Sequence, residues 1–177
     1  MPAVRKKASP KGLIDLLEHG LKDIYYAEKK IYKTLPRIIK AASDDELKDG
    51  LTAHREETAV QISRLQEVFA IIGKKPQAVK CEAIDGILKE GDELLQDFGK
   101  TRAGDAAIVF SCQAVEHYEI TRYGSMQTYA AELGHRDIAK RLGETLAEEQ
   151  NADKTLSKVA VGRVNFAAEE ETPAAAK

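Results

Sequence analysis

Apolar residues recur at gaps of three and four over residues 13–42, the spacing typical of a helix with one buried face. The same period marks three further stretches, residues 46–72, 105–133 and 136–160. Helix-ending signals separate them: Ser43 and Asp44 form a break with a new N-cap, and Gly73 and Gly134 follow the second and third stretches. The pattern therefore predicts four long helices.

The connection between the second and third helices is of a different kind. Residues 73–104 contain a short apolar-periodic piece, about 82–98, and are long enough to run back along a bundle. Two helical hairpins joined by one long crossover predict an all-α, ferritin-like four-helix bundle, whereas a cytokine-like bundle would need two long crossovers. We assign residues 13–164 to this bundle, residues 1–12 to a basic tail and residues 165–177 to a flexible tail.

Several acidic residues occupy positions where the helical pattern calls for apolar side chains. Glu28, Glu119 and Glu149 lie in the apolar stripes of the first, third and fourth helices. In the second helix Glu57 lies about 60° from the centre of the stripe, one turn from His54. Two more acids lie about one turn from a seam glutamate, namely Glu116 and Asp153.

The heights of these residues also agree. The first turn lies about midway between Glu28 and Glu57, and the turn at His135 lies about midway between Glu119 and Glu149. Each hairpin therefore brings two carboxylates to nearly the same level at mid-bundle. Tyr32 and Tyr123 each follow a seam glutamate by four residues, and either could donate a hydrogen bond to a neighbouring carboxylate.

Ionised carboxylates buried without partners cost several kcal/mol each, so their convergence needs neutralisation. Two divalent cations would balance Glu28, Glu57, Glu119 and Glu149. An oxygen-rich set with at most one or two imidazoles suits iron, or manganese as the alternative, better than copper or structural zinc. The competing interpretation is that helix faces are misjudged and that protons and Arg122 neutralise the acids without metal.

Composition removes other classes of function. Lys and Arg number 27 against 29 Asp and Glu, a net charge of −2, which gives no bulk reason to bind nucleic acid or an anionic membrane. No apolar run approaches the roughly 20 residues that span a bilayer, and no apolar core follows the basic N-terminus to make a secretory signal, so we expect a cytoplasmic protein. Cys81 and Cys112 make neither a disulfide framework nor a zinc motif.

Five stretches of the sequence together resemble a known group. They are DIYYAEKKI, HREETAVQISRLQEVF, GKKPQAVKCEAIDGIL, VEHYEITRYG and LGETLAEEQNADKTL. In these stretches, from about Leu13 to Val161, the chain resembles the YciE/YciF ferroxidase-type family of the ferritin-like superfamily.

The resemblance implies a four-helix bundle that forms a homodimer, carries a di-iron or dimanganese centre and is linked to stress responses. It places the metal ligands on Glu28, His54, Glu57, Glu119 and Glu149, with Glu116 and Asp153 as further candidates. The wider superfamily has two Glu-x-x-His motifs. Here the second helix reads His54-x-x-Glu57 and the fourth reads Glu149-x-x-x-Asp153, without a second histidine.

The leading hypothesis is a ferroxidase-type protein that oxidises Fe(II) with oxygen or hydrogen peroxide at a dinuclear site. Glu57 and Glu149 would bridge the metals, with Glu28 and His54 on one metal and Glu119 with Asp153 or Glu116 on the other. A manganese-catalase or peroxidase is the nearest enzymatic alternative, and a non-enzymatic stress-related helical scaffold is the alternative from another class. Iron storage would require a closed cage, and nothing in the sequence identifies cage-forming faces.

Overall fold

The computed structural model describes residues 11–170, which are helical except for the connecting loops and contain no strand. The elements are α1 (Leu13–Ala41), α2 (Asp45–Ile71), α3 (Glu82–Phe98), α4 (Gly104–Glu132), α5 (Arg136–Val159), the π-helical turn η1 (Ala160–Val164) and α6 (Asn165–Glu169). The predicted helices agree with α1 to α5 to within a residue or so at each end. None of the helices in this range is long and apolar enough to cross a membrane.

Local chemistry explains where the helices begin and end. The Asp44 carboxylate accepts a hydrogen bond from the Leu47 amide (3.0 Å) and caps α2. Asp105, in the first turn of α4, accepts from the Ser43 and Asp44 amides (2.8 and 2.9 Å) and so fixes the α1–α2 turn to the start of α4. Gly73 and Gly134, just past α2 and α4, have φ of 68° and 77°, a left-handed conformation that favours glycine.

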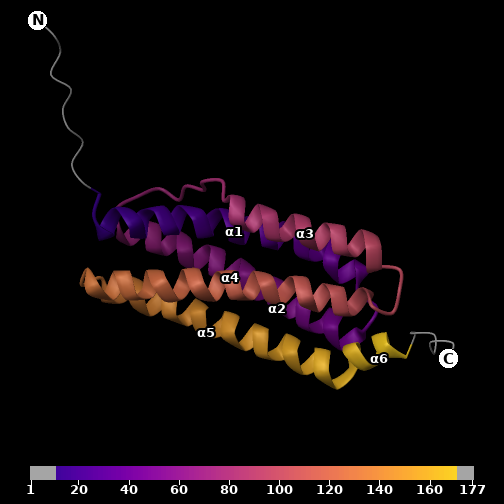
Figure 1. Ribbon diagram of the computed structural model, residues 1–177. Coiled ribbons are helices and arrows are strands. Elements are labelled where there is room, and N and C mark those ends of the chain that lie inside the picture. Colours follow the sequence, from indigo (N-terminus) through magenta and orange to yellow (C-terminus); the bar gives the residue numbers. More distant parts are fainter. Residues whose placement is uncertain (1–10, 171–177) are drawn as a thin grey trace, which may run out of the picture.

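The chain forms two antiparallel hairpins, α1–α2 and α4–α5, that pack together (Figure 1). Between them, the segment after α2 returns along α1, where the Val79 amide donates to the Lys22 carbonyl (3.1 Å). Helix α3 continues in the same direction along α1. Asp85 accepts a hydrogen bond from the Tyr26 hydroxyl (2.9 Å), and Asp92 pairs with Arg37 further along α1. This is the single long crossover that the sequence predicts, and it confirms the ferritin-like topology.

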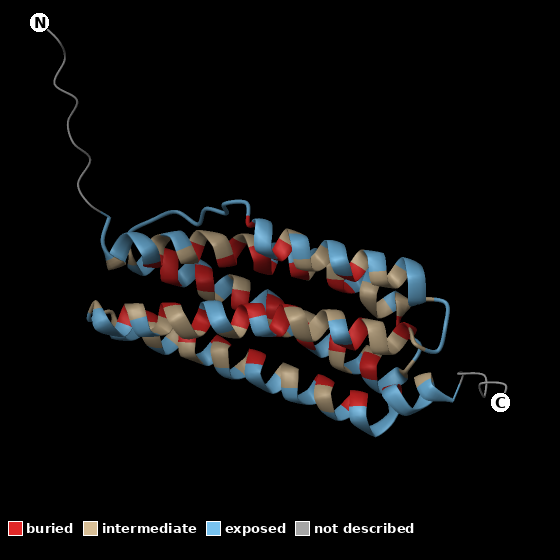
Figure 2. Cartoon of the chain, viewed as in Figure 1, coloured by how far each residue is buried: buried red, intermediate tan, exposed pale blue. Residues whose placement is uncertain are grey.

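The core runs the length of the bundle between the two hairpins, where the buried faces of the helices meet (Figure 2). Its largest fully buried side chains include Phe69, Tyr123 and Leu142. The predicted apolar stripes supply most of the core, although Ile14 at the start of α1 is 42% exposed. Among the buried polar residues, a group of acids and one histidine lies at mid-bundle.

The C-terminal end differs from the sequence prediction. We expected a flexible tail from residue 165, but the helical path continues through η1 and α6 to Glu169. Ala160 and Val164 remain buried against the bundle, which extends the helix past α5. The five residues of α6 bury no side chain, and Phe166 is 64% exposed, so the apolar pattern gave no signal for this turn. Residues 1–10 of the predicted basic tail, and residues 171–177, lie outside the described residues.

Candidate metal centre

Four of the predicted ligands meet in the middle of the bundle. His54 from α2, Glu116 and Glu119 from α4, and Glu149 from α5 are all buried, and one ligand atom of each lies within 4.8 Å of the others. Glu116 and Glu119 share a helix face because they are three residues apart. The His54 Nε2 atom lies 3.4 Å from Oε1 of Glu116. We call these four residues the acid–histidine group.

Glu28 of α1 lies beside this group. Its side chain is fully buried, and one of its carboxylate oxygens accepts a hydrogen bond from the Tyr123 hydroxyl. Its charge raises the pKa of both Glu116 and Glu119, so the three carboxyl groups interact electrostatically. The predicted role of Tyr123 as a donor to a carboxylate is confirmed. Tyr32, its counterpart on α1, instead lies under the Arg55 guanidinium, 4.3 Å from the ring centroid.

The other two predicted ligands, Glu57 and Asp153, lie outside the acid–histidine group and are less buried than its members. Glu57 is half-buried and lines a cavity that also reaches His54 and Glu116. Asp153 is partly exposed, accepts a hydrogen bond from the Gln113 amide (2.9 Å) and lies 3.4 Å from the exposed His117. As the structure stands, neither belongs to the acid–histidine group. Their ligand roles, and the bridging role of Glu57, stay predictions.

Burial sets the protonation of the centre. It raises the pKa of Glu28, Glu116 and Glu119 well above the usual range, and the neighbouring carboxylates raise these pKa values further. Burial also raises the pKa of Glu149 to about 7. Burial lowers the pKa of His54 to about 4, so its imidazole is neutral at pH 7 and keeps a lone pair for a metal.

Many polar atoms of the centre have no hydrogen-bond partner among the residues described. Glu28, Glu116 and Glu119 each have one such oxygen, both oxygens of Glu149 are unpaired, and so is Nδ1 of His54. Buried polar atoms are normally paired, so a cluster of unpaired ones needs an explanation. Protons would neutralise the carboxylates but leave most of these lone pairs without a partner. Divalent cations would neutralise the carboxylates and also bind the lone pairs. The donor set of carboxylates and one imidazole fits iron or manganese.

A partly buried ion pair beside the centre was not predicted. The Arg64 guanidinium on α2 donates to both oxygens of Glu148 on α5 (2.7 and 2.9 Å) and to the Thr145 hydroxyl (2.6 Å). Gln61 donates to the same carboxylate (3.2 Å). The positive charge of Arg64 lowers the pKa of Glu28, although burial still dominates that pKa. The sequence offered one sign of this pair. Glu148 precedes the core residue Glu149, and a second acid beside a buried one could have suggested a basic partner.

The interpretation that Arg122 neutralises the buried acids is wrong. Its side chain is 45% exposed, lies 3.8 Å from Asp23 and covers the ring of Tyr118 at 5.0 Å. The guanidinium therefore points to the outer side of α4 and α1, away from Glu119. Arg64 acts on the centre instead, since its charge lowers the pKa of Glu28, and its carboxylate partner Glu148 already balances its charge.

Replacing Arg64 by alanine is expected to lower the free energy of unfolding by about 2–3 kcal/mol, because the partly buried Glu148 carboxylate would lose two charged hydrogen bonds. Urea unfolding measures the change. Arg141→Ala, which removes an exposed ion pair with Glu67, is the matched control and should cost at most about 1 kcal/mol. Equal losses for the two variants would show that the Arg64–Glu148 pair has no special weight.

The fold and the buried group together define a class of protein. An antiparallel four-helix bundle with one long crossover, and with carboxylates and a histidine directed into its core, is a ferritin-like bundle with a candidate metal site. Residues 12–169 match a family described as a domain of unknown function, DUF892, and the chain belongs to this family. Protein YciF of Escherichia coli K12 is 39% identical over 160 residues, covering 90% of this chain and 96% of YciF.

Solved structures agree with this family assignment. YcfI of Rhodopseudomonas palustris, described as a candidate structural protein, is 49% identical with a TM-score of 0.84. The crystal structure of the E. coli stress protein YciF is 38% identical with a TM-score of 0.83. Each match covers 88% of this chain and 99% of the other. A Xanthomonas campestris protein, 21% identical over 90% of this chain and 97% of its own with a TM-score of 0.71, shares the fold.

Proposed function

We propose that this protein binds two divalent metal ions at the acid–histidine group and Glu28, and that it oxidises Fe(II) with oxygen or hydrogen peroxide. The observation that carries the proposal is the set of unpaired, buried carboxylate oxygens. Glu28, Glu116, Glu119 and Glu149 would supply four negative charges, which two divalent cations balance. Iron is the first candidate, and manganese is the alternative with the same ligand preference.

The residues of the chain have distinct parts in this proposal. His54 would bind through a ring nitrogen, since burial keeps it neutral, and Glu116 lies next to it. Glu119 and Glu149 would bind from α4 and α5, and the Tyr123 hydroxyl would orient Glu28. In the net reaction with oxygen, two Fe²⁺ ions each lose one electron, and O₂ takes up two electrons and two protons to leave as H₂O₂. The apolar core would keep bulk water from Glu28, Glu119 and Glu149, which are fully buried.

The physiological setting is proposed by analogy. The E. coli relative is named a stress protein, and oxidation of free Fe(II) would suit such a role. The structural role ascribed to the R. palustris relative supports a second candidate, a metal-free scaffold. In that case the raised pKa values of the acids would keep them protonated.

Metal content and iron oxidation test these functions together. The protein is purified without chelators, its Fe and Mn are counted, and metal-free protein receives Fe(II) anaerobically before oxygen is admitted. About two metal ions per chain and rapid formation of a ferric absorption band support the proposal. Glu119→Gln should abolish this oxidation, whereas Glu132→Gln, an exposed glutamate on the same helix, should leave it unchanged.

Other outcomes would favour the alternatives. Bound manganese with rapid peroxide dismutation would point to a catalase. A protein that binds neither metal at these residues, and that keeps its stability when the buried acids become glutamines, would point to the scaffold.

A further inference from the structure

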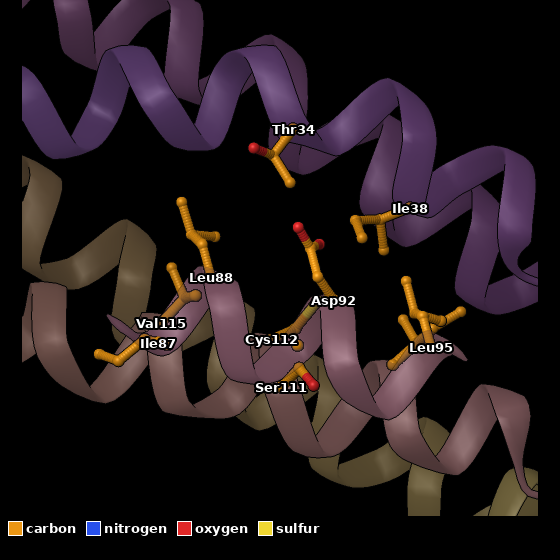
Figure 3. A pocket seen from close by; sticks show the side chains of 11 residues that line it. Thr34, Ile38, Ile87, Leu88, Asp92, Leu95, Ser111, Cys112 and Val115 are labelled. Atoms are coloured by element: carbon orange, nitrogen blue, oxygen red, sulfur yellow. The ribbon is translucent and has the colours of Figure 1, made fainter. Parts of the chain in front are cut away.

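An apolar cavity lies beside the candidate metal centre, between α1, α3 and α4. It has a volume of about 40 Å³. Figure 3 shows Thr34 and Ile38 of α1 on one side of it, Leu88 and Leu95 of α3 on another, and Cys112 of α4 at its base. Only a few polar side chains, among them those of Asp92 and Ser111, reach its lining.

A second cavity of about 40 Å³ adjoins the first on the side of the acid–histidine group. The two cavities share five lining residues, namely Thr34, Ile38, Leu88, Cys112 and Val115. The inner cavity also touches Ile31 and Leu35, and it reaches His54 and Glu116 of the acid–histidine group. An almost wholly apolar path therefore leads from the α1–α3 side of the bundle to two candidate ligands.

The size and the apolar lining of this path favour small uncharged molecules over ions. A volume of about 40 Å³ exceeds the roughly 10–15 Å³ that one water-sized molecule needs, yet apolar cavities stay dry and accept small apolar guests. A cation entering this path would lose its hydration without gaining ligands. Cys112 adds no charge, because burial and the nearby Glu116 raise the pKa of its thiol to about 12.

A separate cavity, which we call the polar cavity because three glutamates line it, also reaches His54 and Glu116. It has a volume of about 160 Å³, lies between α2 and α5, and is lined by Glu46, Glu57 and Asn151 as well as by His54 and Glu116. Its acidic lining suits a hydrated cation. Charged and uncharged molecules therefore have different ways to the centre.

We infer that the two apolar cavities form a passage that delivers dioxygen, a small uncharged molecule, to the His54–Glu116 side of the centre, while metal ions use the polar cavity. The use of dioxygen rests on the proposed function. The passage itself is a property of the side chains of α1, α3 and α4, and it can be tested without metal or activity.

Crystals of the metal-free protein under xenon pressure test the passage, because xenon enters dry apolar cavities. A xenon peak is expected between Cys112, Val115 and Thr34. Cys112→Phe and Thr34→Leu would fill the junction from opposite walls, and each should remove the peak. Gly50→Leu, whose added side chain meets no atom within 4 Å at its Cβ, projects towards the polar cavity and is the control that should keep the xenon peak.

Oxygen consumption by iron-loaded protein gives the second measurement. The two filling variants should consume oxygen about tenfold more slowly than wild type with unchanged metal content, since access would then need a structural opening. Gly50→Leu should slow metal uptake and leave the oxygen rate of loaded protein unchanged. If Cys112→Phe does not fold, Thr34→Leu carries the test from the other wall.

Failure of the passage and failure of the proposed function are distinguishable. Absence of xenon from the wild-type cavities, or a normal oxygen rate in a variant that excludes xenon, overturns the passage and leaves the ferroxidase proposal standing. Xenon in the cavities of a protein that does not oxidise Fe(II) supports an apolar binding site but overturns its assignment to dioxygen.

Discussion

Manganese(II) is expected to raise the melting temperature of the metal-free protein by about 8–16 °C when present at a thousandfold excess over its dissociation constant. A ligand that binds only the folded state at that excess adds about 4 kcal/mol of stability. The acid–histidine group exists only in the fold, because its residues come from three helices. Glu149→Gln should lose most of the gain, since the amide keeps the shape of the side chain and removes one charged ligand.

Calorimetry or a thermal shift with increasing Mn²⁺ measures this effect. Gln150 follows Glu149 at an exposed position, so Gln150→Glu is a control that adds an acid outside the core and should keep the full gain. Manganese avoids the oxidation that would complicate the same titration with iron. An equal gain for wild type and Glu149→Gln would place any bound metal elsewhere on the protein.

Without metal, the free energy of unfolding is expected to fall as pH rises from about 4.5 to 8. The folded-state pKa values of the buried glutamates lie above their ordinary value of 4.5, so the folded protein holds protons that the unfolded chain has released. This stabilisation is complete below pH 4.5 and is lost as pH rises through the folded pKa. For Glu149, whose pKa is raised to about 7, the loss amounts to about 3 kcal/mol.

His54 acts in the opposite direction over part of this range. Its pKa is lowered to about 4, so its contribution is complete above pH 6.5 and is lost as pH falls towards 4. Several acids outweigh one imidazole, and the net slope above pH 6.5 belongs to the acids alone. Urea unfolding in the presence of EDTA measures the slope between pH 6.5 and 8.

Glu149→Gln provides the check on this pH dependence. The variant should be more stable than wild type at pH 8 and should show a shallower slope, because the amide has no proton to lose. If the stability of the wild-type protein did not change between pH 6.5 and 8 with EDTA present, the acids would be solvated and their pKa values would not be raised.

Periodicity predicted the fold well because each of the helices α1 to α5 has a buried face. The breaks at Asp44, Gly73 and Gly134 marked the ends of the helices, and the length of the segment after α2 indicated the crossover. The short helix α6 escaped prediction because it buries no side chain. Where a helix has no apolar stripe, the pattern carries no information.

The centre was predictable to the extent that its residues interrupt apolar stripes. Glu28, Glu119 and Glu149 lie in such stripes and are buried, while the 60° offset of Glu57 agrees with its half-burial. The Arg64–Glu148 pair was not predictable in the same way, because it depends on how α2 and α5 lie side by side. The apolar cavities depend on the volumes of side chains from four helices, which a periodic pattern does not contain.

Crystals soaked anaerobically with Fe(II) and measured at the iron absorption edge test the central claim most directly. Anomalous peaks are expected at mid-bundle, surrounded by His54, Glu116, Glu119 and Glu149, with Glu28 within reach. Peaks only on exposed acids, or a centre that remains without iron in well-soaked crystals, would contradict the claim.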